Sequence, residues 1–319
     1  MPPAPDAVRC VGLVGTGVIG SGWALHFLRR GFDVAAFDPA PDAAQRLTAT
    51  VERHWPTMER LGLAPGARRD RLRVAESLEA AVADAQVVQE STPEDRAAKV
   101  ALFARLDAAA APDVALLSST SGFAMSDLQA GCAHPGRTVV GHPFNPPYLI
   151  PLVEVVGGAR TDPAYVDWAA AFYTAAGKHV LRMERELPGF IGNRLQEAMW
   201  REALHMVAAG EATVEQIDAA IAHGPGLRWA AMGPCLTFHL AGGAGGMAHM
   251  LDHFGPALEE PWTRLAAPPL TDQLRERMVD GCRRAAGGRS IADLERERDA
   301  CLIAILEALD GIAGRAPGD

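Results

Sequence analysis

A glycine-rich turn near the amino terminus constrains what this chain can fold into more than any other feature. Residues 10–15 have the apolar pattern of a buried strand, and Gly15-Thr16-Gly17-Val18-Ile19-Gly20 follows with the spacing Gly-x-Gly-x-x-Gly. A helical pattern covers 18–30, and a second strand pattern covers 33–37 and ends at Asp38. Strand, glycine turn, helix, strand and acid in this order predict the start of a parallel sheet that binds a dinucleotide.

The residues of this turn meet separate physical demands. Gly15 permits a tight turn, Gly17 lets a pyrophosphate approach the backbone, and Gly20 lets helix and strand pack closely. The helix amino terminus would face the phosphates with its partial positive charge. Asp38, 18 residues after the last glycine, would accept hydrogen bonds from the ribose hydroxyls and repel a 2′-phosphate. The predicted cofactor is therefore NAD rather than NADP, bound by Gly15, Gly17, Val18, Ile19, Gly20 and Asp38.

Strand and helix patterns alternate through the first 185 residues. Further strand patterns occur at 72–75, 86–89, 113–117, 137–141, 152–156 and 179–182. One helical segment between them, 40–61, contains Pro56 and is expected to kink or break there. The alternation predicts an α/β fold with a doubly wound, Rossmann-type sheet of about eight strands. Only helical patterns follow, so we predict an NAD-binding domain over 1–188 and a smaller all-helical substrate and dimerisation domain over 189–319.

The segment around His142 carries the strongest sign of chemistry. His142 ends a predicted strand, three prolines stiffen the loop that follows, and Glu154 is the one charge in the apolar run 152–156. A carboxylate in such a run costs free energy unless something pairs with it. The imidazole at the end of the preceding strand is the obvious partner, and the pair would form a carboxylate-oriented general base. The alternative is a solvent-facing Glu154 on an edge strand and a surface His142.

Two polar loops follow strands at the same expected edge of the sheet. Glu94 lies in the loop after the strand at 86–89, with Lys99 about one helical turn beyond, and four hydroxyl side chains at 118–121 follow another strand. Open α/β sheets bind ligands at the carboxyl ends of their strands. Both loops also have a simpler explanation, because acids and hydroxyl side chains commonly cap helices and Lys99 would then be solvated.

Composition excludes several classes of function. A net charge of −9 and the lack of a clustered basic and aromatic stretch argue against nucleic acid as a partner. No apolar run reaches the length that spans a bilayer, and the first residues lack a signal-peptide pattern. Five dispersed cysteines without a CxxC pair indicate reduced thiols. We therefore expect a cytoplasmic protein with no membrane partner.

Two residue types are so depleted that the survivors become informative. Lys99 and Lys178 are the only lysines among 30 basic residues, and Asn145 and Asn193 are the only asparagines. The survivors are candidates for positions that arginine or aspartate cannot fill. Lys178 is the exception, since the sequence assigns it no role.

Taken together, these motifs resemble the L-3-hydroxyacyl-CoA dehydrogenase superfamily along essentially the whole chain. The resemblance rests on the glycine turn, Ser-Ser-Thr-Ser-Gly from 118, His-Pro-Phe-Asn-Pro from 142, Leu-Val-Glu-Val-Val from 152 and Pro-Gly-Phe-Ile-Gly-Asn-Arg from 188. It implies NAD-dependent oxidation of a 3-hydroxyl group, with active-site roles at Ser121, His142, Glu154 and Asn193, in a cleft between the domains. It also implies that Glu94 and Lys99 lie on the nicotinamide side of the cofactor.

Within that superfamily the chain is most similar to a branch that acts on free 3-hydroxy acids such as carnitine and gulonate. The similarity lies in 145–151, 226–234, 255–258 and 288–299. The acyl-CoA enzymes lack an arginine like Arg228, and a planar guanidinium suits a free carboxylate; a purely structural Arg228 is the alternative. Carnitine is the expected substrate, with gulonate or a short 3-hydroxyacyl-CoA as alternatives. The trimethylammonium of carnitine needs an aromatic cage, for which the candidates are Phe144, Tyr148, Trp200 and Trp229.

Three further questions stay open at the level of sequence. A non-catalytic, NAD-binding structural protein is the rival from another class, although the four active-site residues argue against it. A stripe on the last helical segment predicts a homodimer interface, with packing inside one subunit as the alternative; it comprises Ile291, Leu294, Leu302, Ile305 and Leu309. His249 and His253 are four residues apart, but no third ligand has a clear spacing, so we expect no metal site.

Overall fold

The structure is a computed structural model that describes residues 2–255, 263, 264, 266 and 268–313, and it separates into two compact units. The first unit is Met1–Asn193 and the second is Arg194–Asp319. This division falls five residues after the boundary expected at 188, and it leaves Asn193 in the first unit.

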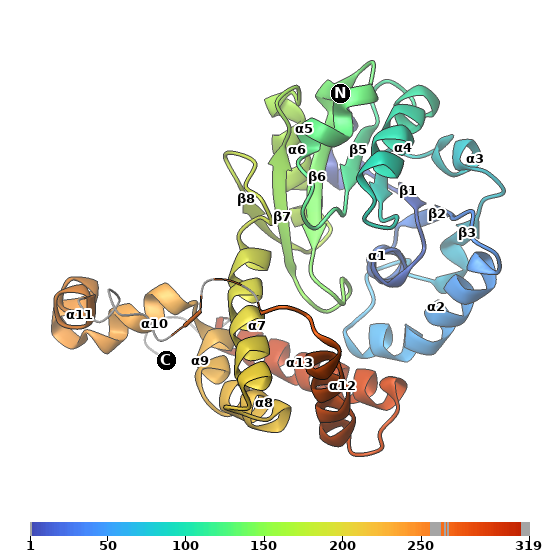
Figure 1. Cartoon of the computed structure of the whole chain (residues 1–319). Coiled ribbons are helices and arrows are strands. Elements are labelled where there is room, and N and C mark those ends of the chain that lie inside the picture. Colours follow the sequence, from blue (N-terminus) through green and yellow to red (C-terminus); the bar gives the residue numbers. More distant parts are fainter. Residues whose placement is uncertain (1, 256–262, 265, 267, 314–319) are drawn as a thin grey trace. The chain divides into compact units, whose positions relative to one another are not determined.

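The first unit contains one sheet of eight strands in the order β3-β2-β1-β4-β5-β6-β7-β8 (Figure 1). The strands are β1 Cys10–Val14, β2 Asp33–Phe37, β3 Leu72–Val74, β4 Val87–Glu90, β5 Ala115–Ser118, β6 Thr138–Pro143, β7 Leu152–Gly157 and β8 His179–Arg182. Neighbouring strands pair in parallel except β6 and β7, which run antiparallel. The predicted doubly wound α/β fold is confirmed.

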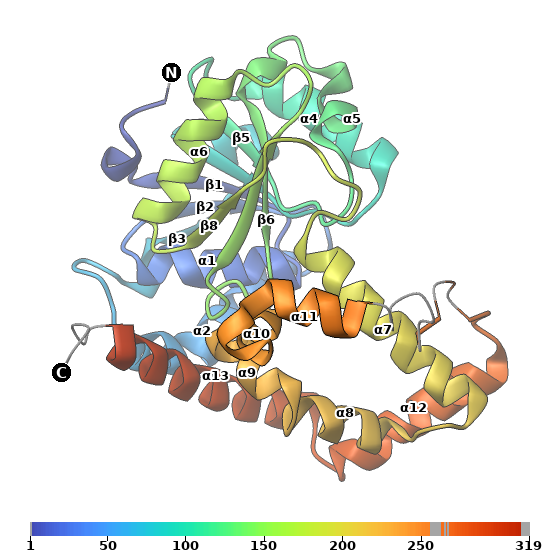
Figure 2. The ribbon, with the colours of Figure 1, turned by 90° about the vertical axis from the view of Figure 1, so that its left-hand side faces the viewer.

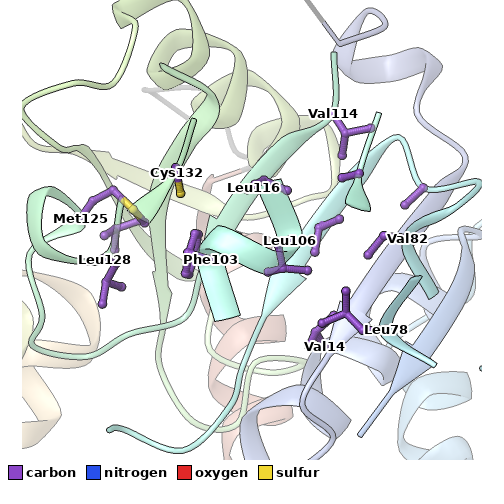
Figure 3. Close-up of a cluster of buried hydrophobic side chains, with 14 of the residues drawn as sticks. Val14, Leu78, Val82, Phe103, Leu106, Val114, Leu116, Met125, Leu128 and Cys132 are labelled. Atoms are coloured by element: carbon purple, nitrogen blue, oxygen red, sulfur yellow. The ribbon is translucent and has the colours of Figure 1, made fainter. Parts of the chain in front are cut away.

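Helices cover both faces of this sheet (Figure 2). They are α1 Val18–Arg29, α2 Ala43–Arg60, α3 Leu78–Val82, α4 Arg96–Ala109, α5 Met125–Leu128 and α6 Pro163–Ala175. Trp23 of α1 stacks on Tyr173 of α6 on one face. On the other face, side chains of α3, α4 and α5 form a hydrophobic cluster with the strands, with Phe103 and Leu106 among its members (Figure 3). Since the central strands are buried on both faces, apolar residues dominate them, as in β1 and β5.

Local sequence signals explain where several of these helices begin and end. Ser77 caps α3 by accepting from the backbone N–H of Ala80, and Asp95 caps α4 by accepting from that of Ala98. The helix α2 continues through Pro56 to Arg60, so the expected break is absent. A proline removes only one backbone donor, and the buried Trp55 and Met58 beside it keep the helix packed against its unit.

The described part of the second unit is helical throughout. Its helices are α7 Gly192–Ala209, which begins in the first unit, α8 Val214–Ala222, α9 Pro225–Ala231, α10 Pro234–Ala241, α11 Gly246–Phe254, α12 Asp272–Ala286 and α13 Ile291–Ala313. Val207, Val214 and Leu274 join α7, α8 and α12 in a small core. The helix α9 begins at Pro225, and proline is favoured at a first helical position.

Two kinds of feature are absent from the part of the chain that the structure describes. No helix there is long and apolar enough to cross a membrane. No three histidine, cysteine or acidic side chains there come together in a way that could hold a metal ion. The rings of His249 and His253 stack with their centroids 5.8 Å apart.

Candidate active site

The loops that carry the predicted site residues of the first unit leave the sheet at one edge. Val14 at the end of β1 pairs with Glu90 at the end of β4, and Glu90 pairs with Ser118 at the end of β5. Ser118 also pairs with Val140, two residues before His142 in β6. The carboxyl ends of these strands therefore lie together, as they do at the ligand sites of open α/β sheets.

The glycine turn after β1 has the geometry that a dinucleotide requires. Gly15 has a φ of +89°, and a side chain on it would come within 2.6 Å of Ser91. A side chain on Gly20 would lie 1.9 Å from the carbonyl oxygen of Gly15, whereas one on Gly17 would meet nothing within 4 Å. The open space at Gly17, at the amino end of α1, suits the close approach of a pyrophosphate, so the residues fit NAD.

Asp38 lies just past β2 and contacts this turn. Its Oδ2 accepts from the N–H of Thr16 at 2.8 Å and from the Thr16 hydroxyl at 3.1 Å, and its Oδ1 accepts from the N–H of Ala40 at 2.9 Å. The carboxylate is thus held at the glycine turn, where the sequence places the ribose contact. Val18, which is exposed, and Ile19, which is half-buried, form the first turn of α1 beside it.

His142 and Glu154 form a buried pair across two adjacent strands. The antiparallel register of β6 and β7 sets them directly opposite each other. Nδ1 of His142 lies 2.8 Å from Oε2 of Glu154, and the exposed fractions of the two residues are 4% and 0%. Because β7 lies between β6 and β8, the alternative of a solvent-facing edge glutamate is wrong.

The second oxygen of Glu154 is occupied by backbone donors. Oε1 accepts from the N–H of Ile191 at 3.0 Å and from that of Gly192 at 2.9 Å. Burial by itself would raise the pKa of Glu154, but the hydrogen bonds from His142 and from these backbone groups hold that pKa below its usual range. An ionised carboxylate only accepts, so Nδ1 of His142 carries a proton and Nε2 is free to take one.

The loop between β6 and β7 is anchored by Lys178. Its Nζ donates to the carbonyl oxygen of Pro147 and, at 2.9 Å, to that of Ile150. The loop carries Phe144, whose ring centroid lies 4.9 Å from that of His142. Lys178, to which the sequence assigned no role, therefore fixes the loop that follows the catalytic candidate.

Ser121 is held from two sides. Oε1 of Glu94 accepts from the Ser121 N–H at 2.9 Å, from its hydroxyl at 3.3 Å and from the Thr120 hydroxyl at 2.6 Å. Nδ2 of Asn193 donates to the carbonyl oxygen of Ser121 at 2.7 Å. Burial opposes ionisation of Glu94, but the Thr120 hydroxyl, the charge of Lys99 and the Ser121 N–H keep the pKa of Glu94 below its ordinary value. Ser121 and Asn193 are thus in direct contact.

Lys99 is buried rather than solvated, and its nearest acid is one that sequence reasoning missed. Its Nζ lies 2.7 Å from Oε1 of Glu90 and 3.4 Å from Oε2 of Glu94. The simpler explanation of Glu94 as a helix cap is wrong, because Asp95 caps α4. Glu90 is the last residue of β4, one position beyond the predicted strand, and was therefore counted with the loop. A charge directly after an apolar strand was the available signal.

The remaining substrate-binding candidates are distributed over both units. Tyr148, in the first unit, is only 7% exposed, and its hydroxyl lies 3.4 Å from Nδ1 of His54 on α2. In the second unit, Trp200 lies on α7, and Arg228 and Trp229 lie on α9; all three are exposed.

Residues 10–187 match the NAD binding domain of 3-hydroxyacyl-CoA dehydrogenase, and residues 189–286 match its C-terminal domain. The chain belongs to the 3-hydroxyacyl-CoA dehydrogenase family and is an NAD-dependent dehydrogenase. The predicted family, fold class and cofactor are confirmed.

Two relatives of high sequence identity carry the same enzyme name. The L-carnitine dehydrogenase of Streptomyces griseus is 66% identical over 99% of this chain and 93% of its own. That of Streptomyces coelicolor is 64% identical over 96% of both chains. Among solved structures, 5-formyl-3-hydroxy-2-methylpyridine 4-carboxylic acid 5-dehydrogenase, described as an NAD+ dependent dismutase, has a TM-score of 0.81 at 26% identity and covers 97% of this chain and 100% of that one.

Proposed function

We propose that the protein oxidises the 3-hydroxyl group of L-carnitine to a ketone with NAD. The observation that carries the proposal is the buried His142–Glu154 pair at 2.8 Å, at the sheet edge that also bears the glycine turn. The identity of the relatives supports the choice of substrate, since chains 64% and 66% identical are named L-carnitine dehydrogenase.

The chemistry divides between the cofactor and the side chains of this chain. The glycine turn and Asp38 would hold NAD, which would supply the hydride acceptor for the carbon that bears the hydroxyl group. Nε2 of His142 takes the hydroxyl proton, and Glu154 stabilises the imidazolium that results. Ser121 and Asn193 hydrogen-bond the reacting oxygen and fix its position. The contact between Ser121 and Asn193 supports their acting on one atom.

Substrate recognition in this proposal rests on charge and on aromatic surface. Arg228 binds the free carboxylate through its planar guanidinium. The trimethylammonium of carnitine carries no N–H, so aromatic faces bind it. Trp200 and Trp229, which are exposed, and Phe144 serve this role best; the burial of Tyr148 against His54 leaves it little free surface.

A substrate panel tests the function directly. L-carnitine, L-gulonate and, in the reverse direction, acetoacetyl-CoA are assayed with NAD or NADH by absorbance at the nicotinamide band. We expect turnover of carnitine to exceed that of the other two. Preference for gulonate or for acetoacetyl-CoA would reassign the substrate but not the reaction, and no turnover of any substrate would favour a non-catalytic, NAD-binding protein.

Arg228→Met tests the carboxylate contact while keeping much of the side-chain volume. Loss of a charge-assisted hydrogen bond costs about 1.5–3 kcal/mol, so KM for carnitine should rise roughly ten- to a hundredfold. Arg275→Met is the matched control, because Arg275 is also an exposed helical arginine of the second unit. An unchanged KM in Arg228→Met would leave Arg228 with a structural role.

Assembly and location complete the proposal. We propose a homodimer formed through the helical unit, since its last helix exposes apolar side chains such as Ile291 at 73% and Ile305 at 41%. Sedimentation at micromolar concentration tests it, and a monomer would contradict it. A cytoplasmic location is proposed because all five cysteines are free thiols.

A further inference from the structure

Glu90 is a fully buried carboxylate on which four donors converge. Its Oε1 accepts from the N–H and the hydroxyl of Thr92, both at 2.6 Å, and from Nζ of Lys99 at 2.7 Å. Its Oε2 accepts from the hydroxyl of Ser118 at 2.6 Å. An amide side chain would match this set less well, because one of its two terminal atoms is itself a donor. The surroundings therefore select an ionised carboxylate.

Two routes lead from Glu90 to Glu94, and together they close a ring. On one side, Lys99 lies between the two carboxylates, 2.7 Å from Glu90 and 3.4 Å from Glu94. On the other side, the Ser118 hydroxyl accepts from the N–H of Thr120 at 3.1 Å, and the Thr120 hydroxyl donates to Glu94 at 2.6 Å. The ring joins the ends of β4 and β5 to α4.

Besides its peptide bond to Thr120, Ser121 is attached to this ring through one oxygen of Glu94. Oε1 of Glu94 accepts the Ser121 N–H at 2.9 Å, the Ser121 hydroxyl at 3.3 Å and the Gly122 N–H at 3.3 Å. The position of Glu94, together with the Asn193 side chain on the Ser121 carbonyl oxygen, therefore sets the orientation of the serine. Glu94 is partly exposed, with 38% of its side chain accessible, whereas Glu90 is completely buried. The rigid end of the ring is thus Glu90.

The free-energy cost of burying charges favours a positioning role for Glu90 over a stabilising one. Burying a carboxylate and an ammonium costs desolvation free energy that their attraction often does no more than offset. If Glu90 lost its charge, Lys99 would be left with Glu94 as its carboxylate partner, and Glu94 would move toward Lys99 and away from the serine. We propose that Glu90 is a positioning residue that keeps Glu94, and through it Ser121, in the orientation that the reaction requires. The proposal rests on the role of Ser121 in the proposed function.

A double-mutant cycle on kcat tests this chain of contacts. Glu90→Gln removes the charge and keeps the shape, and we expect kcat to fall roughly ten- to a hundredfold. In a Ser121→Ala background the same substitution should change kcat by less than about twofold, because the group that it positions is already gone. Equal losses in the two backgrounds would show that Glu90 does not act through Ser121 and would overturn the proposal.

Two further variants separate positioning from folding. Glu79→Gln is the matched control, because it removes a carboxylate from an exposed ion pair with Arg105 at 2.8 Å, away from the ring; its kcat should be unchanged. Ser118→Ala breaks only the second route and leaves both charges in place. If Glu90→Gln does not fold, Ser118→Ala carries the same cycle, with the same two outcomes.

Hydrogen exchange makes the test independent of the substrate. The cycle runs on whichever substrate of the panel the wild-type protein turns over, so failure on carnitine alone does not affect it. If no substrate is turned over, amide exchange at Ser121 and Gly122 decides. We expect faster exchange there in Glu90→Gln than in the wild type or in Glu79→Gln, and unchanged exchange would overturn the proposal.

Discussion

Glu154 and Glu90 are both carboxylates without exposed surface in one sheet, yet they are held in different ways. Glu154 lies in the middle of β7, and its partners are the imidazole directly across the strand pair and two backbone N–H groups. Glu90 lies at the end of β4, and its partners include side chains of Lys99 and Ser118 from two other elements. Strand register alone therefore positions His142, whereas Ser121 depends on several loop and helix side chains acting together.

The largest effect is expected at the strand pair itself. His142→Ala should lower kcat by about 10²–10⁴-fold, because it removes the general base. NADH binding, measured by fluorescence, should be unchanged, since the residue acts on the substrate proton. A variant that keeps more than about half of the wild-type kcat would remove His142 from the mechanism.

Substitution of Glu154 sharpens the comparison, because the geometry of the pair predicts that the substitution changes the tautomer of His142. In Glu154→Gln the two backbone N–H groups retain the carbonyl oxygen, so the amide nitrogen faces Nδ1 of His142 and donates to it. The proton then moves to Nε2, and kcat should fall by roughly 10²–10⁴-fold, as in other carboxylate–histidine pairs. Glu154→Ala leaves the imidazole free to change tautomer and should retain more activity. The reverse order of the two variants would contradict this assignment.

Substitution of a third buried charged residue, Lys178, should give the smallest effect. We expect that effect on the free energy of unfolding rather than on catalysis. The described partners of Lys178 are two carbonyl oxygens and the ring of Trp23, 5.0 Å away. Burial, with a contribution from the charge of Arg29, lowers the pKa of Lys178 to about 7. His26 lies nearby and is itself buried, with its pKa well below the ordinary value.

The sign of the pH effect follows from this depressed pKa. Between pH 7 and pH 10.5 the unfolded chain binds a proton at Lys178 that the folded chain does not, so this residue makes the folded state more stable as pH rises. The contribution between pH 7 and pH 9 is about 2 kcal/mol. Denaturant unfolding at pH 7 and at pH 9 should show that the free energy of unfolding rises more for the wild type than for Lys178→Met. Equal rises in the two proteins would refute the assignment.

Much of the fold could be predicted because buried parallel strands are apolar runs with polar ends. The strands at 33–37, 152–156 and 179–182 were located to within a residue or so. The sequence predicted parallel strands throughout, and the one antiparallel pair was not foreseen, because the hydrophobic pattern is the same for parallel and antiparallel neighbours. The antiparallel step from β6 to β7 nevertheless decides the site, since it sets His142 opposite Glu154.

The site itself was only half accessible from the sequence. His142 and Glu154 could be paired because a single charge in an apolar run requires a partner. Glu90 gave the same signal, but ending the strand one residue early assigned it to the loop that follows. No signal in the sequence pointed to Lys178, because its partners are backbone carbonyl oxygens of residues 28 and 31 positions away. Every residue has a carbonyl oxygen, so such partners have no signature in a sequence.

The burial of both lysines has a consequence for how this protein responds to chemical modification. Lys99 is 1% exposed and Lys178 is 6% exposed, and the chain has no other lysine. Acylating reagents directed at ε-amines therefore find no lysine on the folded surface, which bears arginines instead. Each lysine becomes reactive only when its own part of the fold opens. Mass spectrometry of the two acylated peptides over time would thus record separately the opening of the Glu90 ring and the release of the loop after His142.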